Sequence, residues 1–177
     1  MISDKNKKLL RKLAAGLISQ KAFDKSFKKK FNLNEIDLLL NESLGNNSLF
    51  HMYFWYCPKN LDYTEKDILF KKYISINEGH HEHEEMLSYF HRNFINPIGN
   101  IDILTKLIEQ PPHYFFAEGR QMVFIDKCIF TIAQQPEPFN LEALEELAKS
   151  EDEKIKDLAL HQIEKRKQYG RWENEKD

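Results

Sequence analysis

The sequence has little cysteine, glycine and proline. Its 177 residues include two Cys, six Gly and six Pro. An all-β sandwich or barrel needs a turn about every 8 to 12 residues, and so more turn-forming residues than these. Two cysteines are too few for a disulfide framework in a chain of this length, and both lie in apolar stretches. We therefore expect a reducing, cytoplasmic location.

The sequence also lacks a long hydrophobic run. Met1 is followed by the polar segment 3–8 without an apolar segment behind it, so no secretory signal is expected. The longest apolar cluster, 49–57, stops at Pro58 and is far shorter than the roughly 20 residues of a membrane-spanning helix. We expect a soluble protein without membrane contact.

Aromatic residues are abundant, with 13 Phe, 7 Tyr and 2 Trp. This content excludes a disordered chain. Apolar residues recur at intervals of three or four along nearly every segment, which predicts an all-α protein of about nine or ten helices. Asn34 and Thr64 are the expected N-caps of two of them, and the clearest helices are 140–149 and 152–167.

The second half of the chain repeats with an offset of 40 residues. Placing 90–97 over 130–137 aligns three pairs of apolar residues, Ile101 with Leu141, Leu104 with Leu144 and Leu107 with Leu147. Each copy has a helix, a turn with proline, and an asparagine that can cap a second helix. This is the period of HEAT and armadillo units. Eight side chains are expected to be buried between stacked helices: Leu104, Leu107, Cys128, Ile132, Leu144, Leu147, Leu158 and Ile163.

Residues 140–148 followed by 151–159 resemble a HEAT-repeat junction. More widely, residues 78–167 resemble short bacterial HEAT-like proteins. The resemblance implies a short, irregular HEAT-like helical-repeat solenoid at 78–177, ending in a short polar tail. An N-terminal helical region at 1–77, which matches nothing as clearly, would pack on the repeats in a single folding unit. Some proteins of this kind are immunity proteins encoded beside secreted or contact-delivered toxins.

Charge is unevenly distributed along the chain. Residues 1–33 hold ten Lys or Arg and two Asp, a net charge of +8, so residues 34–177 carry −10 of the total of −2. An acidic body repels nucleic acid and attracts a basic protein. The lysines of the N-terminal arm can neutralise phosphates. However, the spacing of four between Phe23, Phe27 and Phe31 places these rings together in a core, away from most of the lysines, rather than on nucleobases.

The densest group of reactive side chains is the histidine-rich segment 78–85. A zinc-protease helix needs His-Glu-x-x-His, and neither His81 nor His83 has a second histidine four positions on. A di-iron bundle needs two Glu-x-x-His copies, and Glu78 with His81 is the only one. We therefore expect no metal and no cofactor, and interpret the segment as the first turn of a surface helix, with His80–Glu84 and His81–Glu85 pairs.

Nucleophilic catalysis is not indicated either. Cys57 precedes a proline, and Cys128 falls on the apolar face of an expected core helix. No serine lies in a Gly-x-Ser-x-Gly setting, and there is no glycine-rich phosphate loop. The aromatic segment 50–56 is typical of a fully buried helix. The sequence does not predict an enzyme.

The leading hypothesis is an immunity protein, monomeric when free, that occludes the active site of a cognate basic toxin domain, with a nuclease favoured. Toxins that cut nucleic acid are basic around the substrate, so acidic side chains are the expected contacts. The apolar linker 111–119 adds aromatic ones. The expected partner-binding residues are Glu82, Glu84, Glu85, Asp102, Glu109, Tyr114, Phe115, Glu118, Glu142, Glu145 and Glu146. The alternatives are a HEAT-like protein–protein adaptor and, third, an RNA-binding module using the N-terminal lysines.

Overall fold

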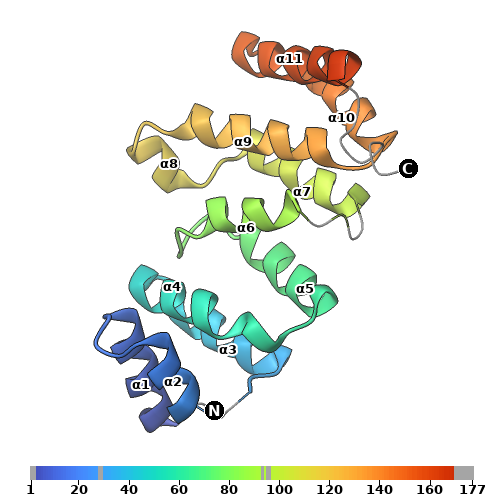
Figure 1. Cartoon of the computed structure of the whole chain (residues 1–177). Helices are drawn as coiled ribbons and strands as arrows, with labels where there is room; N and C mark the ends of the chain where they lie inside the picture. The colour runs from blue at the N-terminus through green and yellow to red at the C-terminus, as the bar shows by residue number, and fades with distance from the viewer. Residues whose placement is uncertain (1–2, 28–29, 93, 95–96, 170–177) are drawn as a thin grey trace. The chain divides into compact units, whose positions relative to one another are not determined.

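The computed structural model describes residues 3–27, 30–92, 94 and 97–169, and these residues contain helices and no strand (Figure 1). The all-α prediction is therefore confirmed. Eleven α-helices and one short 3₁₀ helix are present in the described residues, rather than nine or ten. The chain forms two compact units, Met1–Glu82 and His83–Asp177. The boundary between these units lies between Glu82 and His83.

The first unit contains five α-helices. They are α1 (Asp4–Ala14), α2 (Gln20–Ser26), α3 (Leu33–Ser43), α4 (Asn47–Tyr56) and α5 (Tyr63–Ile74), with η1 (Pro58–Asn60) between α4 and α5. Helix α4 packs against α1 and α3, and α3 also packs against α5. Phe23 and Phe31 are buried, and both rings lie against Phe27, with centroids 4.6 and 5.4 Å away. The prediction that these rings belong to a core is confirmed.

The predicted caps of two helices in this unit are wrong. The N-caps are Asn32 and Asp62, not Asn34 and Thr64. Each is followed by a glutamate at the third helical position, which closes a reciprocal pair of hydrogen bonds. In α5, Asp62 accepts from the Glu65 amide at 2.8 Å, and the Glu65 carboxylate accepts from the Asp62 amide at 3.1 Å. This pair of hydrogen bonds outweighs the single hydrogen bond that Thr64 could accept as an N-cap.

The sequence predicted that the aromatic helix α4 is buried on every side, but one side is exposed. Phe50, Tyr53 and Phe54 are buried, whereas Trp55 is 44% exposed. The indole N–H donates to the carboxylate of Glu82 at 3.1 Å, while part of the ring remains in contact with water. A large apolar ring whose N–H finds a hydrogen-bond partner is the arrangement that suits tryptophan.

The second unit contains six helices. They are α6 (His83–Phe90), α7 (Pro97–Glu109), α8 (His113–Ala117), α9 (Gln121–Gln134), α10 (Phe139–Leu147) and α11 (Glu153–Tyr169). Helix α9 is the centre of this unit, because it contacts each of the other five helices. Its buried residues are Phe124, Ile125, Cys128, Ile129, Thr131, Ile132 and Ala133. The two helices predicted most clearly, 140–149 and 152–167, are present as α10 and α11 with ends within two residues of the prediction.

The repeat predicted that two asparagines 40 residues apart cap helices, but neither of them does. Asn100 and Asn140 lie inside α7 and α10 and are buried. Both side chains donate to the C-terminal end of α9: Asn100 to the side chain of Gln135 at 3.0 Å, and Asn140 to the carbonyl of Ala133 at 3.1 Å. Buried polar groups need such partners, so each asparagine joins a second helix to α9.

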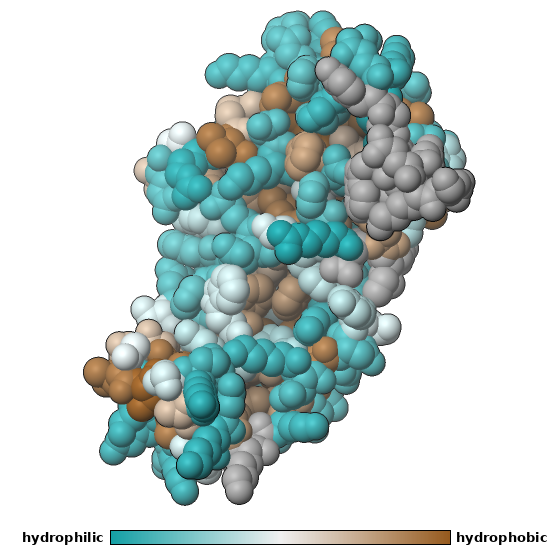
Figure 2. Space-filling model, viewed as in Figure 1, coloured by the Kyte–Doolittle hydropathy of each residue, from teal (hydrophilic) through white to brown (hydrophobic). Residues whose placement is uncertain are grey.

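Five of the eight expected core residues are buried, namely Leu104, Leu107, Cys128, Ile132 and Leu144. For Leu147, Leu158 and Ile163 the prediction is wrong, because these side chains are half-buried. Leu158 and Ile163 lie on α11, the last helix described, which packs against α9 and α10. Leu147 lies at the edge of a cleft, which is described below. In Figure 2, hydrophilic side chains cover most of the visible face and hydrophobic ones show through between them.

Candidate functional site

A cleft of about 560 Å³ opens among α7, α9, α10 and α11 in the second unit. Apolar side chains form much of its wall, and three carboxylates reach it from different segments. The lining residues are Thr105, Ile108, Glu109, Gln121, Ile125, Ala143, Glu146, Leu147, Ser150, Asp152 and Ile155. The volume lies within the range typical of ligand pockets, roughly 300–1,000 Å³.

The local sequence explains how each carboxylate reaches the cleft. Glu109 is the last residue of α7, and Glu146 is in the last turn of α10. Asp152 precedes α11 and accepts from the amides of Lys154 at 2.9 Å and Ile155 at 3.3 Å. These bonds hold Asp152 at the N-terminus of α11, as an N-cap does. The cleft thus lies where two helices end and another begins.

The surface beside the cleft is strongly acidic. Residues 137–153 contain seven carboxylates and one lysine, a net charge of −6, and all seven carboxylates are exposed. Lys149 pairs with Glu146 at 2.7 Å, and this hydrogen bond raises the pKa of the lysine. Glu109, Glu142 and Glu145 make no ion pair within the described residues. Glu137 and Glu153 pair with Arg166 and Lys156, which lie outside this segment, so the negative potential here is partly offset.

Four of the predicted binding residues gather at this cleft. Glu109 and Glu146 line it, and Glu142 and Glu145 are exposed on the same helix as Glu146. On a helix, residues three and four apart lie on one face, so these three glutamates form one acidic face of α10. Three more predicted residues are exposed elsewhere in the unit, Glu85 on α6, Asp102 on α7 and Glu118 after α8.

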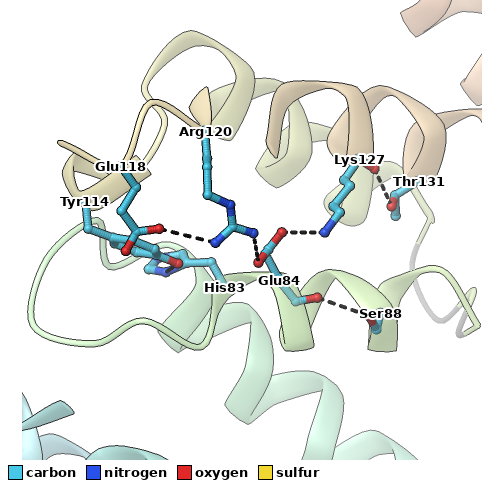
Figure 3. A network of polar contacts seen from close by, with 8 residues as sticks. All are labelled: His83, Glu84, Ser88, Tyr114, Glu118, Arg120, Lys127 and Thr131. Carbon is cyan, nitrogen blue, oxygen red and sulfur yellow. Dashed lines mark hydrogen bonds and ion pairs between the residues drawn. The ribbon is translucent and has the colours of Figure 1, made fainter. Parts of the chain in front are cut away.

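Glu84 is held by partners within its own unit (Figure 3). Its carboxylate accepts from Arg120 at 2.8 Å and from Lys127 on α9. Burial alone would raise the pKa of Glu84, but the hydrogen bonds from Lys127 and Arg120 lower it below its usual value. Arg120 also binds Glu118 at 3.2 Å. Arg120 and Lys127 thus neutralise the negative charge of Glu84, and the ion pair with Lys127 joins α6 to α9.

Glu82 and Phe115, which the sequence predicted to bind a partner, are buried. The Glu82 carboxylate lies 2.8 Å from Nδ1 of His51 and accepts from the Trp55 indole, and its side chain is only 10% exposed. Phe115 is fully buried, and its ring stacks on that of Phe124 with centroids 4.2 Å apart. These contacts use both side chains to stabilise their own units.

Tyr114, also a predicted contact, is half-buried. Its hydroxyl lies 3.4 Å from Nδ1 of His83, and its ring packs 4.2 Å from that of Phe115, centroid to centroid. The segment that was expected to be an apolar linker forms the short helix α8 and folds back on α9. Tyr114 and Phe115 therefore pack within the unit, whereas Phe116 of the same helix is 49% exposed.

Only residues 83–85 of the histidine-rich segment form the first turn of a helix, because α6 begins at His83, and Glu84 and Glu85 are the acidic residues of that turn. His80 and His83 are buried. His80 Nδ1 accepts from the Glu82 amide at 3.2 Å, so the proton is on Nε2, which donates to the carbonyl of Tyr73 at 2.8 Å. Burial lowers the pKa of His80 to about 4. Among the described residues, no three metal-ligating side chains gather at one point.

Both cysteines are buried and free. Burial raises the pKa of Cys57 to about 12 and raises that of Cys128 as well. Both side chains are therefore protonated thiols rather than nucleophilic thiolates at neutral pH. Within the described part of the chain, no helix is both long and apolar enough to cross a membrane.

The cleft and two of its neighbouring acids, Glu151 and Asp152, were not found from the sequence. The signal that points to them is the local charge of −6 over residues 137–153. The half-burial of Leu147, where the repeat predicted a core position, marks the same place. No protein-family model, curated protein or solved structure shows significant similarity to this chain. The functional argument therefore depends on the residues of this chain.

Proposed function

We propose that this chain is an immunity protein that binds a cognate basic toxin domain and occludes its active site. The observation that carries the proposal is the acidic, partly apolar cleft of the second unit, with seven exposed carboxylates and one lysine in residues 137–153. The sequence resemblance to HEAT-like immunity proteins supplies the class of partner. The cleft supplies a surface with the charge and the apolar area that such a partner requires.

A short HEAT-like array is part of the same proposal. The described helices of the second unit support it, because α9 lies between α6 and α11, and α7 packs against α10. In such an array, first helices stack on first helices and second helices on second helices. The repeated asparagines, Asn100 and Asn140, both bond to the C-terminal end of α9, the first from the helix α7 and the second from the helix α10.

The electrostatics suit a toxin that acts on nucleic acid. Such an enzyme must be basic around its substrate groove, so a negative surface speeds encounter and opposes the wrong partners. The half-buried Leu147 and Ile155 offer apolar area at the centre of the charged patch. An apolar centre within a charged rim is the usual arrangement of a protein interface.

The test begins with the product of the gene adjacent to the one that encodes this chain. We expect the two proteins to form a stable complex, and the chain to protect cells that express the toxin. Changing Glu142, Glu145 and Glu146 to Lys should lower affinity by at least about 100-fold and remove protection, because it places like charges against the partner. The expected loss should lie largely in the association rate and shrink as salt is added.

A matched control changes three exposed carboxylates of the same unit that lie outside the cleft and were not expected to bind a partner, Asp126, Asp157 and Glu164, to Lys. This variant has the same net charge as the first, so a general charge effect would weaken both alike. If the product of the adjacent gene does not bind, or if the α10 variant binds as tightly as the control, the proposal is wrong. Selective binding of unrelated host proteins would instead favour an adaptor.

A further inference from the structure

We propose that the cleft receives one arginine side chain of the protein partner. The aliphatic part of the arginine would lie on the apolar wall, and its guanidinium group would pair at the rim with a carboxylate of the lining, that of Glu109, Glu146 or Asp152. The inference rests on the proposed function for the kind of partner, a basic protein. The chemistry of the pocket comes from the cleft itself.

The shape and the apolar wall suit a long side chain. Ile108 and Ile125 are buried at the cleft, whereas Leu147 and Ile155 are half-buried and partly in contact with water in the free protein. Covering exposed apolar area is favourable by about 25 cal/mol per Å². The methylene groups of an arginine would supply that cover, while its charged end remains near the rim.

The charge of the lining is complementary to a cation. Three carboxylates line the cleft, and no lysine or arginine is among the lining residues. Lys149 pairs with Glu146 from outside the cleft, but both side chains of this pair are more than two-thirds exposed. An exposed pair of this kind contributes little stability, so an incoming cation can replace the lysine. Glu109 and Asp152 make no ion pair with a basic side chain among the described residues.

Arginine fits the site better than lysine or a metal ion does. Its guanidinium is planar, is weakly hydrated and donates two parallel hydrogen bonds to a carboxylate, so it tolerates a partly apolar site better than an ammonium does. Arginine is also enriched among the residues that dominate binding energy at interfaces. A metal ion is a poorer occupant, because no three ligating side chains converge within the described residues.

The experiment uses the full chain and a small probe, n-butylguanidinium, which has the aliphatic stem and charged end of arginine. Its neutral analogue, n-butylurea, has nearly the same shape without the charge. Methyl signals of Ile108, Ile125 and Ile155 in carbon–proton NMR spectra report on the cleft. We expect saturable shifts of these signals with n-butylguanidinium, at dissociation constants on the order of millimolar, as for fragments of this size.

The triple variant Glu109→Gln, Glu146→Gln and Asp152→Asn should weaken this binding at least about 10-fold. Asparagine is a good N-cap, so Asp152→Asn should retain the start of α11. Glu164→Gln, which changes an exposed carboxylate outside the cleft, is the control and should bind the probe as the unchanged chain does. Circular dichroism and thermal unfolding establish that the variants are folded.

Three results would overturn the inference: no shift at the three methyl groups, equal shifts with n-butylurea, or unchanged binding by the triple variant. The toxin assay separates this inference from the proposed function. If the toxin binds the acidic face but the probe does not bind, the immunity function is supported and the arginine pocket is contradicted. If the probe binds at the cleft but the adjacent gene product does not bind the chain, the arginine pocket is supported and the immunity function is contradicted.

Discussion

The imidazole of His80 stacks on the ring of Phe50, with centroids 4.3 Å apart and planes 7° from parallel. Phe50 belongs to α4, and His80 lies in the segment that follows α5. Both side chains are fully buried, and His80 also bonds to the carbonyl of Tyr73. The histidine therefore joins two helices of the first unit as a neutral ring, and its protonation has a cost in stability.

The first unit should lose stability as the pH falls. The pKa of His80 is about 4 in the folded protein, against an ordinary value of 6.5. Between these values the unfolded chain binds more protons, so the free energy of unfolding should decrease from pH 6.5 to pH 4, by roughly 3 kcal/mol from this group. The full contribution is present above pH 6.5. Denaturant unfolding followed by Trp55 fluorescence, in a Trp172→Phe background, measures it.

The variant His80→Gln should be less stable at neutral pH but should lose this part of the pH dependence. His161→Gln, which changes an exposed histidine on α11, is the control and should retain the dependence of the unchanged protein. The same slope with pH in the His80→Gln variant would contradict the prediction.

Two leucines of α10 should differ in their contribution to stability. Leu144 is fully buried, whereas Leu147 lines the cleft and is half-buried. Leu144→Ala should lower the free energy of unfolding by about 2 to 5 kcal/mol, because it leaves a cavity. Leu147→Ala should cost about 1 kcal/mol, because the site is open to water. Equal unfolding midpoints for the two variants would show that Leu147 is a core residue.

The α5 cap gives a test of which residue begins the helix. Asp62→Ala should lower stability by about 1 kcal/mol, because the Glu65 amide loses its side-chain acceptor. Thr64→Ala should change stability by less than about 0.5 kcal/mol, since Thr64 is exposed and inside the helix. Thermal unfolding measures both variants. A larger loss of stability for Thr64→Ala than for Asp62→Ala would show that Thr64 is the N-cap, as the sequence predicted.

Glu84 should matter for folding and not for the partner. Glu84→Gln leaves Arg120 and Lys127 without their charged partner, and it should lower stability by about 1 kcal/mol, since both cations are nearly half exposed. Affinity for the cognate toxin should change less than about twofold. Calorimetric titration and chemical unfolding provide the two measurements. A loss of affinity without a loss of stability would return Glu84 to the binding surface.

The two cysteines should react with iodoacetamide only after unfolding. Burial keeps both thiols protonated, and the reagent requires an exposed thiolate. Mass spectrometry at pH 8 should show little modification of the native protein. The denatured protein should show two modified residues. Rapid modification of the native protein at Cys57 or Cys128 would show that the thiol is accessible.

Local patterns were enough to predict which segments are helical. Spacings of three and four between apolar residues lead to α10 and α11 with ends within two residues, and to the burial of Leu104 and Leu144. These features depend on neighbours along the chain, because one turn of helix brings such residues to the same face. Charge counting along the chain likewise indicated Glu109 and Glu146 as binding residues.

The tertiary structure decided how each charged or aromatic side chain is used. Glu82 and Glu85 are three residues apart and chemically identical, yet one is buried against His51 and Trp55 and the other is exposed. The partners of Glu82 lie about 30 positions earlier in the chain, so local spacing carries no trace of them. The cleft arises in the same way: Glu109, Glu146 and Asp152 line one cleft only because α7, α10 and α11 pack against common neighbours. Helix formation follows from local periodicity, whereas burial and charge pairing depend on residues that only packing brings together.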